Sequence, residues 1–514
     1  MSDPSAEMRP MAGAALAATS IALALGTFMQ VLDTSIANVS IPTIAGDLGV
    51  SADQGTWVIT SFAVANGISV PLTGWLMGRY GVVRTFVTSV VLFTIASFLC
   101  GMAWNLPSLI LFRVLQGAVS GPMIPGSQAL MISIFPAARR GSALAIWSMT
   151  TLVAPIAGPV LGGWISDNYQ WPWIFFINVP VGLFCALYCW RAMKSRETPT
   201  RRVPVDKGGF ALLVVWVGAL QIMLDTGKDA DWFNSPVIVV EAIVAAVSFV
   251  AWVIWELTET HPIVNLGLFR SRNFALGAAI TCIGYGVFFG NNVLLPLWLQ
   301  TQLGYIATWA GLVAAPSGVM AVLLTPFAAR LMQRIDVRWA ASAALVTFGL
   351  SFWLRSLYPP DASFGVLVVP LLVQGVAMSA FFTSLLTITL NGIDGARLPM
   401  AAGLSNFTRI TAGSFATSIA TTAWDRGAAL NQNRMADLAP SDGRAWTSAL
   451  GHLRHLGLDT AHAAGLLTGQ FVSQSYLVST LDFFRLSAWL MILMAPAVWL
   501  TAKARSAGGA VAAD

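Results

Sequence analysis

Charged side chains are scarce in this chain. Asp, Glu, Lys and Arg make up 10% of its 514 residues and apolar residues make up 56%, whereas soluble domains carry about 25% charged residues. A soluble protein of this length would form two or more domains with polar surfaces. Too few charges are present to cover such surfaces, so the composition predicts a protein surrounded by lipid.

Several enzyme motifs and metal-binding patterns are missing as well. The sequence contains no G-x-x-x-x-G-K-[ST], H-E-x-x-H or G-x-S-x-G motif, which excludes ATP hydrolysis by a phosphate loop of this chain. The four cysteines lie in apolar stretches without zinc-ligand spacing, so we expect them to be packing residues. His452 and His455 stand three residues apart without a completing Cys or acid. We therefore expect neither a metal nor a cofactor.

Long apolar runs fill most of the chain. A helix needs about 20 mostly apolar residues to cross the hydrocarbon. Such runs predict an all-α polytopic membrane protein with fourteen spans, near 15–40, 54–77, 84–104, 108–132, 141–165, 173–192, 208–225, 236–256, 273–299, 306–329, 339–357, 364–390, 399–424 and 481–502. The first run is too long for a signal peptide, so we expect it to be retained.

The basic residues predict the orientation of these spans, because cytoplasmic loops carry the excess of Lys and Arg. With the N-terminus inside, 19 basic residues fall in inside segments and 6 in outside ones, Arg355 among the latter. We therefore expect cytoplasmic tails at 1–14 and 503–514 and a periplasmic loop at 425–480. The positive net charge is thus a topology signal, and no nucleic-acid surface is expected.

An internal repeat divides the spans. Gln116-Gly117 in the fourth span recurs as Gln374-Gly375 in the twelfth, at an offset of 258 residues. We infer two six-helix bundles, 15–192 and 273–502, with a linker and two inserted helices (about 208–225 and 236–256) in 193–272. Parallel halves of this kind bind substrate near the midplane between them.

A charged side chain within a membrane span costs free energy, so each one is a candidate functional residue. Asp33 lies in the first span, and Arg113 lies in the fourth, on one helix face with Gln116. Burial favours the neutral form of a carboxyl, so Asp33 could load and release protons, with Arg113 as a candidate partner. Alternatively, Asp33 caps a helix break, or the two residues form a static ion pair.

Two further spans carry candidate residues. Arg409 shares a helix face with Asn406 in the thirteenth span, where it either polarises a cavity or binds a neighbouring carbonyl. Glu241 in the eighth span is expected near the outer interface. The fifth span predicts a tight, kinked helix interface from its prolines and small residues, namely Pro155, Gly158, Pro159, Gly162 and Gly163.

Several of these segments resemble motifs of one family. They are Leu32-Asp33-Thr34-Ser35-Ile36-Ala37-Asn38-Val39-Ser40-Ile41-Pro42, Arg113-Val114-Leu115-Gln116-Gly117, Gly158-Pro159-Val160-Leu161-Gly162-Gly163, Trp173-Ile174-Phe175-Phe176-Ile177-Asn178-Val179-Pro180 and Ser405-Asn406-Phe407-Thr408-Arg409. Their order resembles the fourteen-helix drug:proton antiporters (EmrB/QacA type) of the major facilitator superfamily. One departure is that Gly78 stands before Arg79, where the family's loop motif usually has Asp.

The resemblance implies a secondary transporter that exports amphiphilic drugs by alternating access, driven by the proton gradient. It implies proton coupling at Asp33 and Arg113, a hinge in the fifth span, and a substrate cavity or relay that includes Asn38, Gln116, Gln374, Asn406 and Arg409. It also implies an inner-membrane location, a periplasmic adaptor similar to EmrA and an outer-membrane channel similar to TolC. Rival hypotheses are a dedicated exporter of one metabolite, lipid or siderophore, a membrane-embedded lipid enzyme, and a non-transporting receptor.

Overall fold

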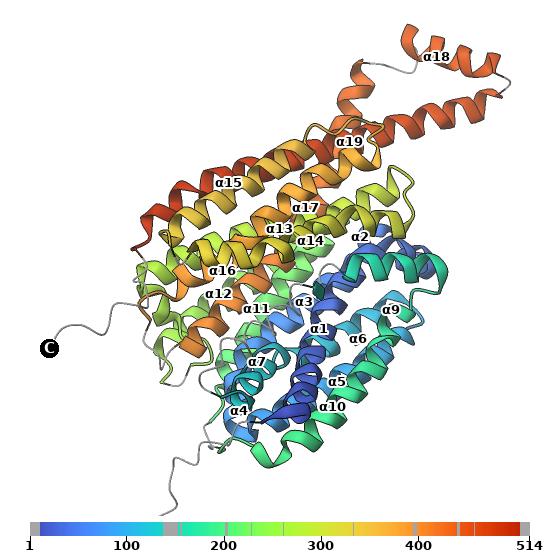
Figure 1. Ribbon diagram of the computed structural model, residues 1–514. Helices are drawn as coiled ribbons and strands as arrows, with labels where there is room; N and C mark the ends of the chain where they lie inside the picture. Colours follow the sequence, from blue (N-terminus) through green and yellow to red (C-terminus); the bar gives the residue numbers. More distant parts are fainter. Residues whose placement is uncertain are drawn as a thin grey trace, which may run out of the picture.

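Every element of the described chain is helical (Figure 1). The computed structural model describes residues 11–136, 153–154, 157–200, 204–227, 229–260, 262–332, 334–393, 398–438, 443–456 and 458–503. Its α-helices are α1 (Gly13–Leu48), α2 (Ala52–Gly55), α3 (Trp57–Ser69), α4 (Thr73–Tyr80), α5 (Val82–Gly101), α6 (Leu106–Ser120), α7 (Met123–Ile134), α9 (Trp173–Phe176), α10 (Asn178–Met193), α11 (Lys207–Thr226), α12 (Pro236–Thr258), α13 (Arg272–Thr301), α14 (Ala307–Met332), α15 (Val337–Arg355), α16 (Phe364–Leu390), α17 (Leu398–Leu438), α18 (Arg444–His455) and α19 (Thr460–Met494). Short 3₁₀ turns join several of them.

The helices account for the predicted spans. Twelve stretches of the described chain are long and apolar enough to cross a membrane, and they match twelve of the fourteen predicted spans. The thirteenth lies in α17, a continuous helix that Ser, Thr and charged residues make less apolar. The fifth, 141–165, is described only in part. Large apolar side chains are exposed on the outward faces, as expected for surfaces that contact lipid, for example Leu187, Val247 and Leu493.

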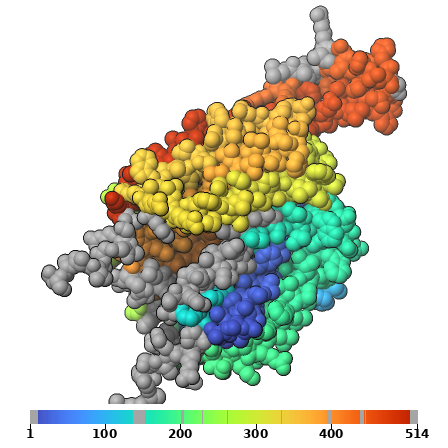
Figure 2. Space-filling view, in the orientation of Figure 1, coloured from blue at the N-terminus to red at the C-terminus, as the bar shows by residue number. Residues whose placement is uncertain are grey.

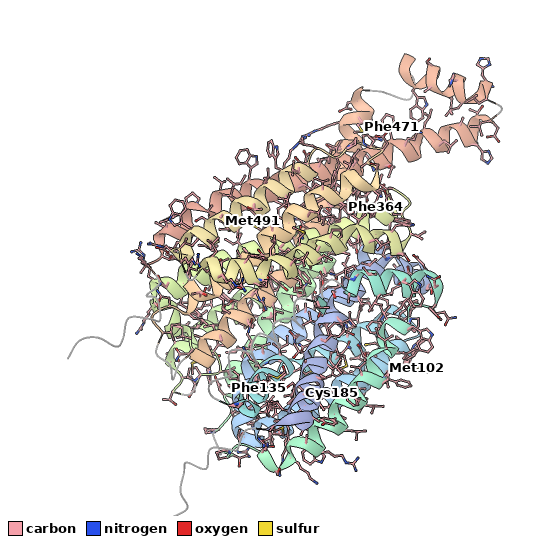
Figure 3. The ribbon with its side chains drawn as sticks, in the orientation of Figure 1. Met102, Phe135, Cys185, Phe364, Phe471 and Met491 are labelled. Atoms are coloured by element: carbon pink, nitrogen blue, oxygen red, sulfur yellow. The ribbon has the colours of Figure 1, made fainter. Side chains whose placement is uncertain are left out.

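The two halves repeat the same packing. In the N-terminal half α5 packs against α6 and α10, and α6 packs against α3. In the C-terminal half α15 packs against α16 and α19, and α16 packs against α14. The repeat detected in the sequence is therefore a repeat of helix arrangement. Each half has its own apolar core, marked in Figure 3 by Cys185 in one half and Met491 in the other.

All four cysteines are free thiols, and Cys100, Cys185 and Cys189 are buried. Cys185 and Cys189 belong to the apolar core of the N-terminal half. The prediction that they are packing residues is confirmed for these two.

The loop between α4 and α5 is held by an acid from another part of the chain. Gly81 adopts a φ of 90°, and a Cβ at this position would overlap the Glu197 side chain. The Glu197 carboxylate accepts hydrogen bonds from the backbone N–H groups of Val83 and Arg84, each at 2.9 Å, at the start of α5. A carboxylate at a helix N-terminus is favourable, so Glu197, which follows α10, ties this loop to the end of the N-terminal half.

An arm projects from one end of the bundle (Figure 2). We define it as residues 427–475, which comprise the end of α17, the whole of α18 and the start of α19. At its base the Trp424 indole N–H donates to Thr480 Oγ1 at 2.8 Å, and the Tyr476 hydroxyl donates to Asp425 at 3.2 Å. Helices α17 and α19 thus continue beyond the bundle into the residues that were predicted as the loop 425–480.

Candidate functional site

A buried polar network surrounds Asp33 in the middle of the N-terminal half. Its Oδ2 accepts from Arg113 Nη1 of α6 at 2.5 Å. Its Oδ1 accepts from Gln116 Nε2 at 3.0 Å and from Asn178 Nδ2 of α10 at 2.8 Å. The side chains of Asp33, Arg113 and Gln116 are fully buried. The predicted pairing of Asp33 with Arg113 is present, and the Asp33 carboxyl accepts from three donors.

Arg113 is enclosed on all sides by its partners. Its Nε donates to the Val58 carbonyl oxygen of α3 at 2.8 Å, and its Nη1 also donates to Gln116 Oε1 at 2.6 Å. The guanidinium carbon lies 4.2 Å from the ring centroid of Phe62 and 5.5 Å from that of Phe175. A buried ion pair is retained only when its remaining polar atoms are satisfied. Here the two charges are satisfied and sealed from water.

Asn178 was not predicted as a site residue, although it lies in one of the family motifs. Besides Asp33, its amide Nδ2 donates to Ser97 Oγ at 3.0 Å, and Ser97 in turn donates to the Phe175 carbonyl oxygen at 2.9 Å. The sequence signal was a polar amide at the start of an apolar helix. The Asn178 side chain connects α10 and α5 to Asp33 on α1.

The Gly/Pro segment of the fifth span lies between the two halves. Residues 157–168 are helical. A Cβ at Gly162 would lie 2.6 Å from the Ile36 carbonyl oxygen of α1, and one at Gly163 would overlap the Ala307 carbonyl oxygen of α14. Only glycine, which has no side chain, lets this helix come close enough to contact both halves. Pro155 lies outside the described residues.

The same helix carries a polar contact between the halves. The Asp167 carboxylate accepts from the backbone N–H groups of Ala307 at 3.2 Å and Thr308 at 2.6 Å, in the first turn of α14. Nearby, Gln300 Nε2 of α13 donates to the Val39 carbonyl oxygen of α1 at 2.9 Å. These contacts join the halves at the end from which the arm projects.

Arg409 forms a second predicted group, in the C-terminal half. Its Nη2 donates to Asn406 Oδ1 at 3.1 Å, and its guanidinium carbon lies 5.0 Å from the Tyr285 ring centroid and 5.9 Å from that of Phe382. Tyr285 stacks on Phe289 with 5.6 Å between centroids. Helices α13, α16 and α17 thus bring together one cation and a group of aromatic rings that sequence reasoning did not identify.

The remaining predicted residues lie apart from one another. Gln374 is buried and accepts through Oε1 from Arg355 Nη2. The prediction that Arg355 lies in an outside segment is wrong: Arg355 ends α15 and is fully buried, because its guanidinium packs against the rings of Phe352 and Phe484. Asn38 is buried, and its amide oxygen has no hydrogen-bond partner among the described residues.

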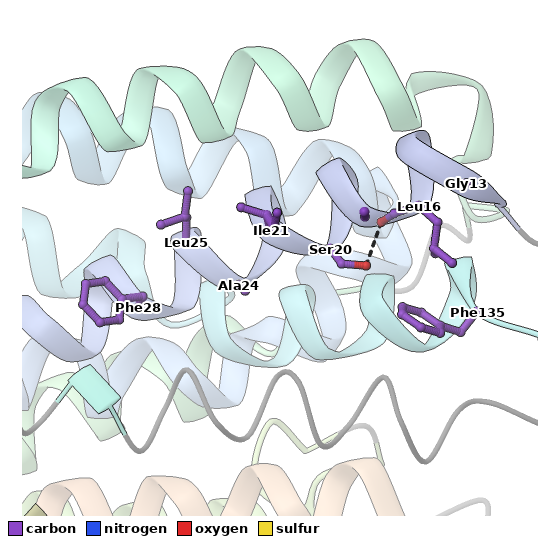
Figure 4. A pocket seen from close by; sticks show the side chains of 9 residues that line it. Gly13, Leu16, Ser20, Ile21, Ala24, Leu25, Phe28 and Phe135 are labelled. Carbon is purple, nitrogen blue, oxygen red and sulfur yellow. Dashed lines mark hydrogen bonds between the residues drawn. The ribbon is translucent and has the colours of Figure 1, made fainter. Parts of the chain in front are cut away.

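An apolar pocket of about 530 Å³ opens along α1 (Figure 4). It extends from Gly13 to Phe28 and is closed at one end by Phe135, which follows α7. Among the described residues that line it, Ser20 alone carries a side-chain hydroxyl, which donates to the Leu16 carbonyl oxygen at 2.8 Å. The lining is suited to aliphatic or aromatic groups.

Three comparisons relate this chain to known proteins. Residues 23–417 match the model of the Major Facilitator Superfamily. The chain is 46% identical over 504 residues to the multidrug export protein EmrB of Escherichia coli K12, with 98% of each chain covered. It is 45% identical over 500 residues to the fatty acid resistance protein FarB of Neisseria gonorrhoeae, with 97% of this chain and 99% of FarB covered.

Solved structures share the fold at low sequence identity. A peptide transporter POT in complex with sulfate aligns with a TM-score of 0.64 at 13% identity and covers 96% of this chain and 97% of its own. A bacterial homologue of the human lysosomal transporter Spinster, in an inward-facing and occupied conformation, aligns with a TM-score of 0.62 at 14% identity and covers 95% and 97%.

Proposed function

Since this chain belongs to the major facilitator superfamily and is an EmrB-like drug efflux transporter, we propose that it exports hydrophobic or amphiphilic drugs in exchange for protons bound at Asp33. The observation that carries the proposal is the sealed network of Asp33, Arg113, Gln116 and Asn178. A carboxyl buried among these donors binds a proton only when the network is rearranged. Proton binding and the arrangement of α1, α6 and α10 are therefore coupled.

The halves provide the second part of the mechanism. The contacts of Asp167 with α14 and of Gln300 with α1 close the end that carries the arm. Rocking of one half against the other breaks these contacts and opens that end. The Gly158–Gly163 segment contacts both halves and is the hinge.

The substrate binds between the halves. The apolar pocket along α1 admits a hydrophobic group from the membrane, and the aromatic rings around Arg409 provide faces for flat ligands. Asn38, Asn406, Gln116 and Gln374 complete the cavity or the proton relay. One proton charge that moves through about 100 mV supplies roughly 2.3 kcal/mol, which sustains a drug gradient of about 50-fold.

The domain organisation follows the repeat. Residues 15–192 and 273–502 form the two bundles, and 193–272 hold the linker and the inserted α11 and α12. The protein lies in the inner membrane with both termini in the cytoplasm, and the arm is periplasmic. There it meets a periplasmic adaptor similar to EmrA, which joins an outer-membrane channel similar to TolC.

Reconstituted proteoliposomes test the function. With an imposed pH gradient, we expect ethidium to accumulate on the side from which protons are taken up, and a protonophore to abolish the accumulation. Ethidium movement that ignores the pH gradient contradicts proton coupling.

A dedicated lipid exporter is the second candidate, because Arg409 offers a cation to an anionic amphiphile and the relative FarB is named for fatty acid resistance. Growth of an efflux-deficient host that expresses this protein, in the presence of drugs or of long-chain fatty acids, distinguishes the two candidate functions. Protection against fatty acids alone favours this candidate.

A further inference from the structure

The inserted helix α11 lies over a junction between the halves. Helix α3 of the N-terminal half packs on α17 of the C-terminal half, and we call this junction the seam. Helix α11 packs on both α3 and α17. Its partner α12 packs mainly on α11 and exposes large apolar side chains such as Val247 and Val250. The seam is therefore covered by α11, and α11 is covered in turn by α12.

Away from the arm, the contact of α11 with the seam is apolar. Leu213 and Val217 of α11 are fully buried. They belong to one cluster with Val64 of α3 and with Leu404 and Phe407 of α17. Close packing of this kind holds membrane helices together, and it is lost when the helices separate.

Near the arm, the contact is polar. Thr60 Oγ1 of α3 donates to Asp225 Oδ2 of α11 at 3.0 Å, and Ser418 Oγ of α17 donates to Asp225 Oδ1. Gln221 Nε2 of α11 donates to Ser418 Oγ at 2.6 Å. Ser414 Oγ of α17 donates to Gln221 Oε1 at 3.0 Å and lies 3.2 Å from the Thr60 carbonyl oxygen. All five side chains are buried, so hydrogen bonds connect α3, α11 and α17 at this end.

The two ends of α11 therefore respond differently when the halves rock. If α3 and α17 part at the end that carries the arm (the arm end), α11 keeps its hydrogen bonds to one helix and loses those to the other. The apolar cluster at the opposite end stays packed. If the halves part at the opposite end, the apolar contacts are lost and the hydrogen bonds stay.

We propose that α11 is a two-ended clamp on the alternating-access step. Its hydrogen bonds hold the arm end closed, and its apolar contacts hold the opposite end closed, so the balance between them fixes the ratio of the two open forms. The proposal rests on the rocking of the halves in the proposed function. Thr60 and Leu213 are positioning residues in this scheme. Weakening the contacts of one or of the other should move the ratio in opposite directions.

Pulsed electron spin resonance in nanodiscs measures both openings without a drug. Spin labels at Met102→Cys, after α5, and Asp361→Cys, before α16, report the arm end. Labels at Tyr80→Cys and Leu331→Cys, near the ends of α4 and α14, report the opposite end. Cys282→Ser removes the one native thiol that is not buried. The measurement is made at a pH at which the wild type shows both a short and a long distance.

Thr60→Val weakens the arm end. The substitution keeps the shape of the side chain and removes its hydrogen bond to Asp225. We expect the ratio of the form open at the arm end to the form closed there to rise about 2- to 12-fold, the effect of one buried hydrogen bond.

Leu213→Ala weakens the opposite end. The truncation removes apolar contacts that α11 makes in the cluster with α3 and α17. We expect the ratio of the form open at this end to the form closed there to rise about fivefold or more, if half of the usual cost of such a truncation falls on the closed form.

Two other substitutions on α11 serve as matched controls. Thr226→Val removes a hydroxyl that donates to the Ile222 carbonyl oxygen of the same helix at 2.7 Å, and Ile222→Ala truncates an exposed side chain. Neither should change the ratio at either end. Ser418→Ala and Val217→Ala repeat the two tests with a different donor and a different apolar residue, in case a first variant does not fold.

The clamp is overturned if Thr60→Val and Leu213→Ala shift the ratio in the same direction, or if they lower the thermal stability and leave the ratio unchanged. A merely structural α11 would give one of these two results. A wild type that shows a single distance at every pH contradicts the rocking itself and with it the proposed function. Drug-driven proton flux by the wild type together with unshifted variants contradicts only the clamp.

Discussion

The two halves share one helix arrangement but place different groups at matching positions. An offset of 258 residues carries Gln116 onto Gln374, and both glutamines are buried next to an arginine. The same offset carries Asp33 onto Asn291. Asn291 is buried and donates to Ser487 Oγ of α19 at 2.9 Å, just as Asp33 bonds with Asn178 of α10. The C-terminal half therefore keeps the polar site and lacks its acid.

The buried arginines of the two halves lie on helices that do not correspond. Arg113 of α6 corresponds to Leu371 of α16, whereas Arg355 of α15 corresponds to Ser97 of α5. Helices α13 to α16 contain no Asp or Glu, and no hydrogen-bond partner is present for Nε and Nη1 of Arg355 in the described part of the chain. In helices α13 to α16, therefore, no acid stands beside Arg355 as Asp33 stands beside Arg113.

The largest expected effect follows from removal of the acid. Asp33→Asn should abolish drug-driven proton flux in proteoliposomes and with it the roughly 50-fold gradient that one proton charge supports. The amide keeps the shape of the side chain, so the purified variant should remain monodisperse. Asn291→Asp in the same chain should not restore flux, because Leu371 stands where Arg113 would be needed. Restored flux would show that the halves are interchangeable.

Close helix packing gives the next contrast. Glycines stand at close helix contacts in both halves; Gly162 of the fifth span faces Ile36 of α1, and Gly286 and Gly290 of α13 face Ala416 and Ala420 of α17. A Cβ at Gly162 would lie 2.6 Å from a backbone oxygen, whereas one at Gly290 would lie 3.1 Å from the Ala420 methyl carbon. Overpacking costs about 1–3 kcal/mol.

Gly162→Ala should therefore lower the initial rate of ethidium transport about 2- to 10-fold, if half of that strain falls on the conformational step. Gly290→Ala should lower it less, because a methyl neighbour can move by a few tenths of an ångström. Gly218→Ala, at an α11 position with open space, is the control. Equal rates for the Gly162 and Gly290 variants would contradict the hinge assignment.

Much of the N-terminal site could be predicted, because Asp33, Arg113 and Gln116 are polar residues in the middle of long apolar runs. Asn178 escaped because it begins its helix, where polar residues usually act as caps. Arg355 failed for the same reason: it lies near the end of the predicted span 339–357 and was counted with the outside segment that follows. Only tertiary packing shows that these helix ends are buried.

The two arginines should differ in their effect on stability. Arg113→Met leaves the Asp33 carboxylate buried without its cation, and removal of one partner of a buried pair costs about 3–5 kcal/mol. Arg355→Met removes a buried charge that has no acid beside it and leaves one glutamine oxygen unpaired, so the change should be small. Thermal unfolding in detergent measures both. An Arg355→Met variant that unfolds as early as Arg113→Met would indicate an anionic partner for Arg355.

The smallest effect on transport is expected from the arm, which belongs only to the C-terminal half. Its base is closed by the contacts of Trp424 with Thr480 and Ser479, so replacement of residues 427–475 by a short Gly/Ser linker leaves the bundle intact. Ethidium transport in proteoliposomes should stay within about twofold of wild type, since no proposed coupling group lies there. Copurification with an EmrA-like adaptor should be lost. Retained copurification would place the adaptor contact on the bundle itself. The arm would then not be a functional difference between the halves.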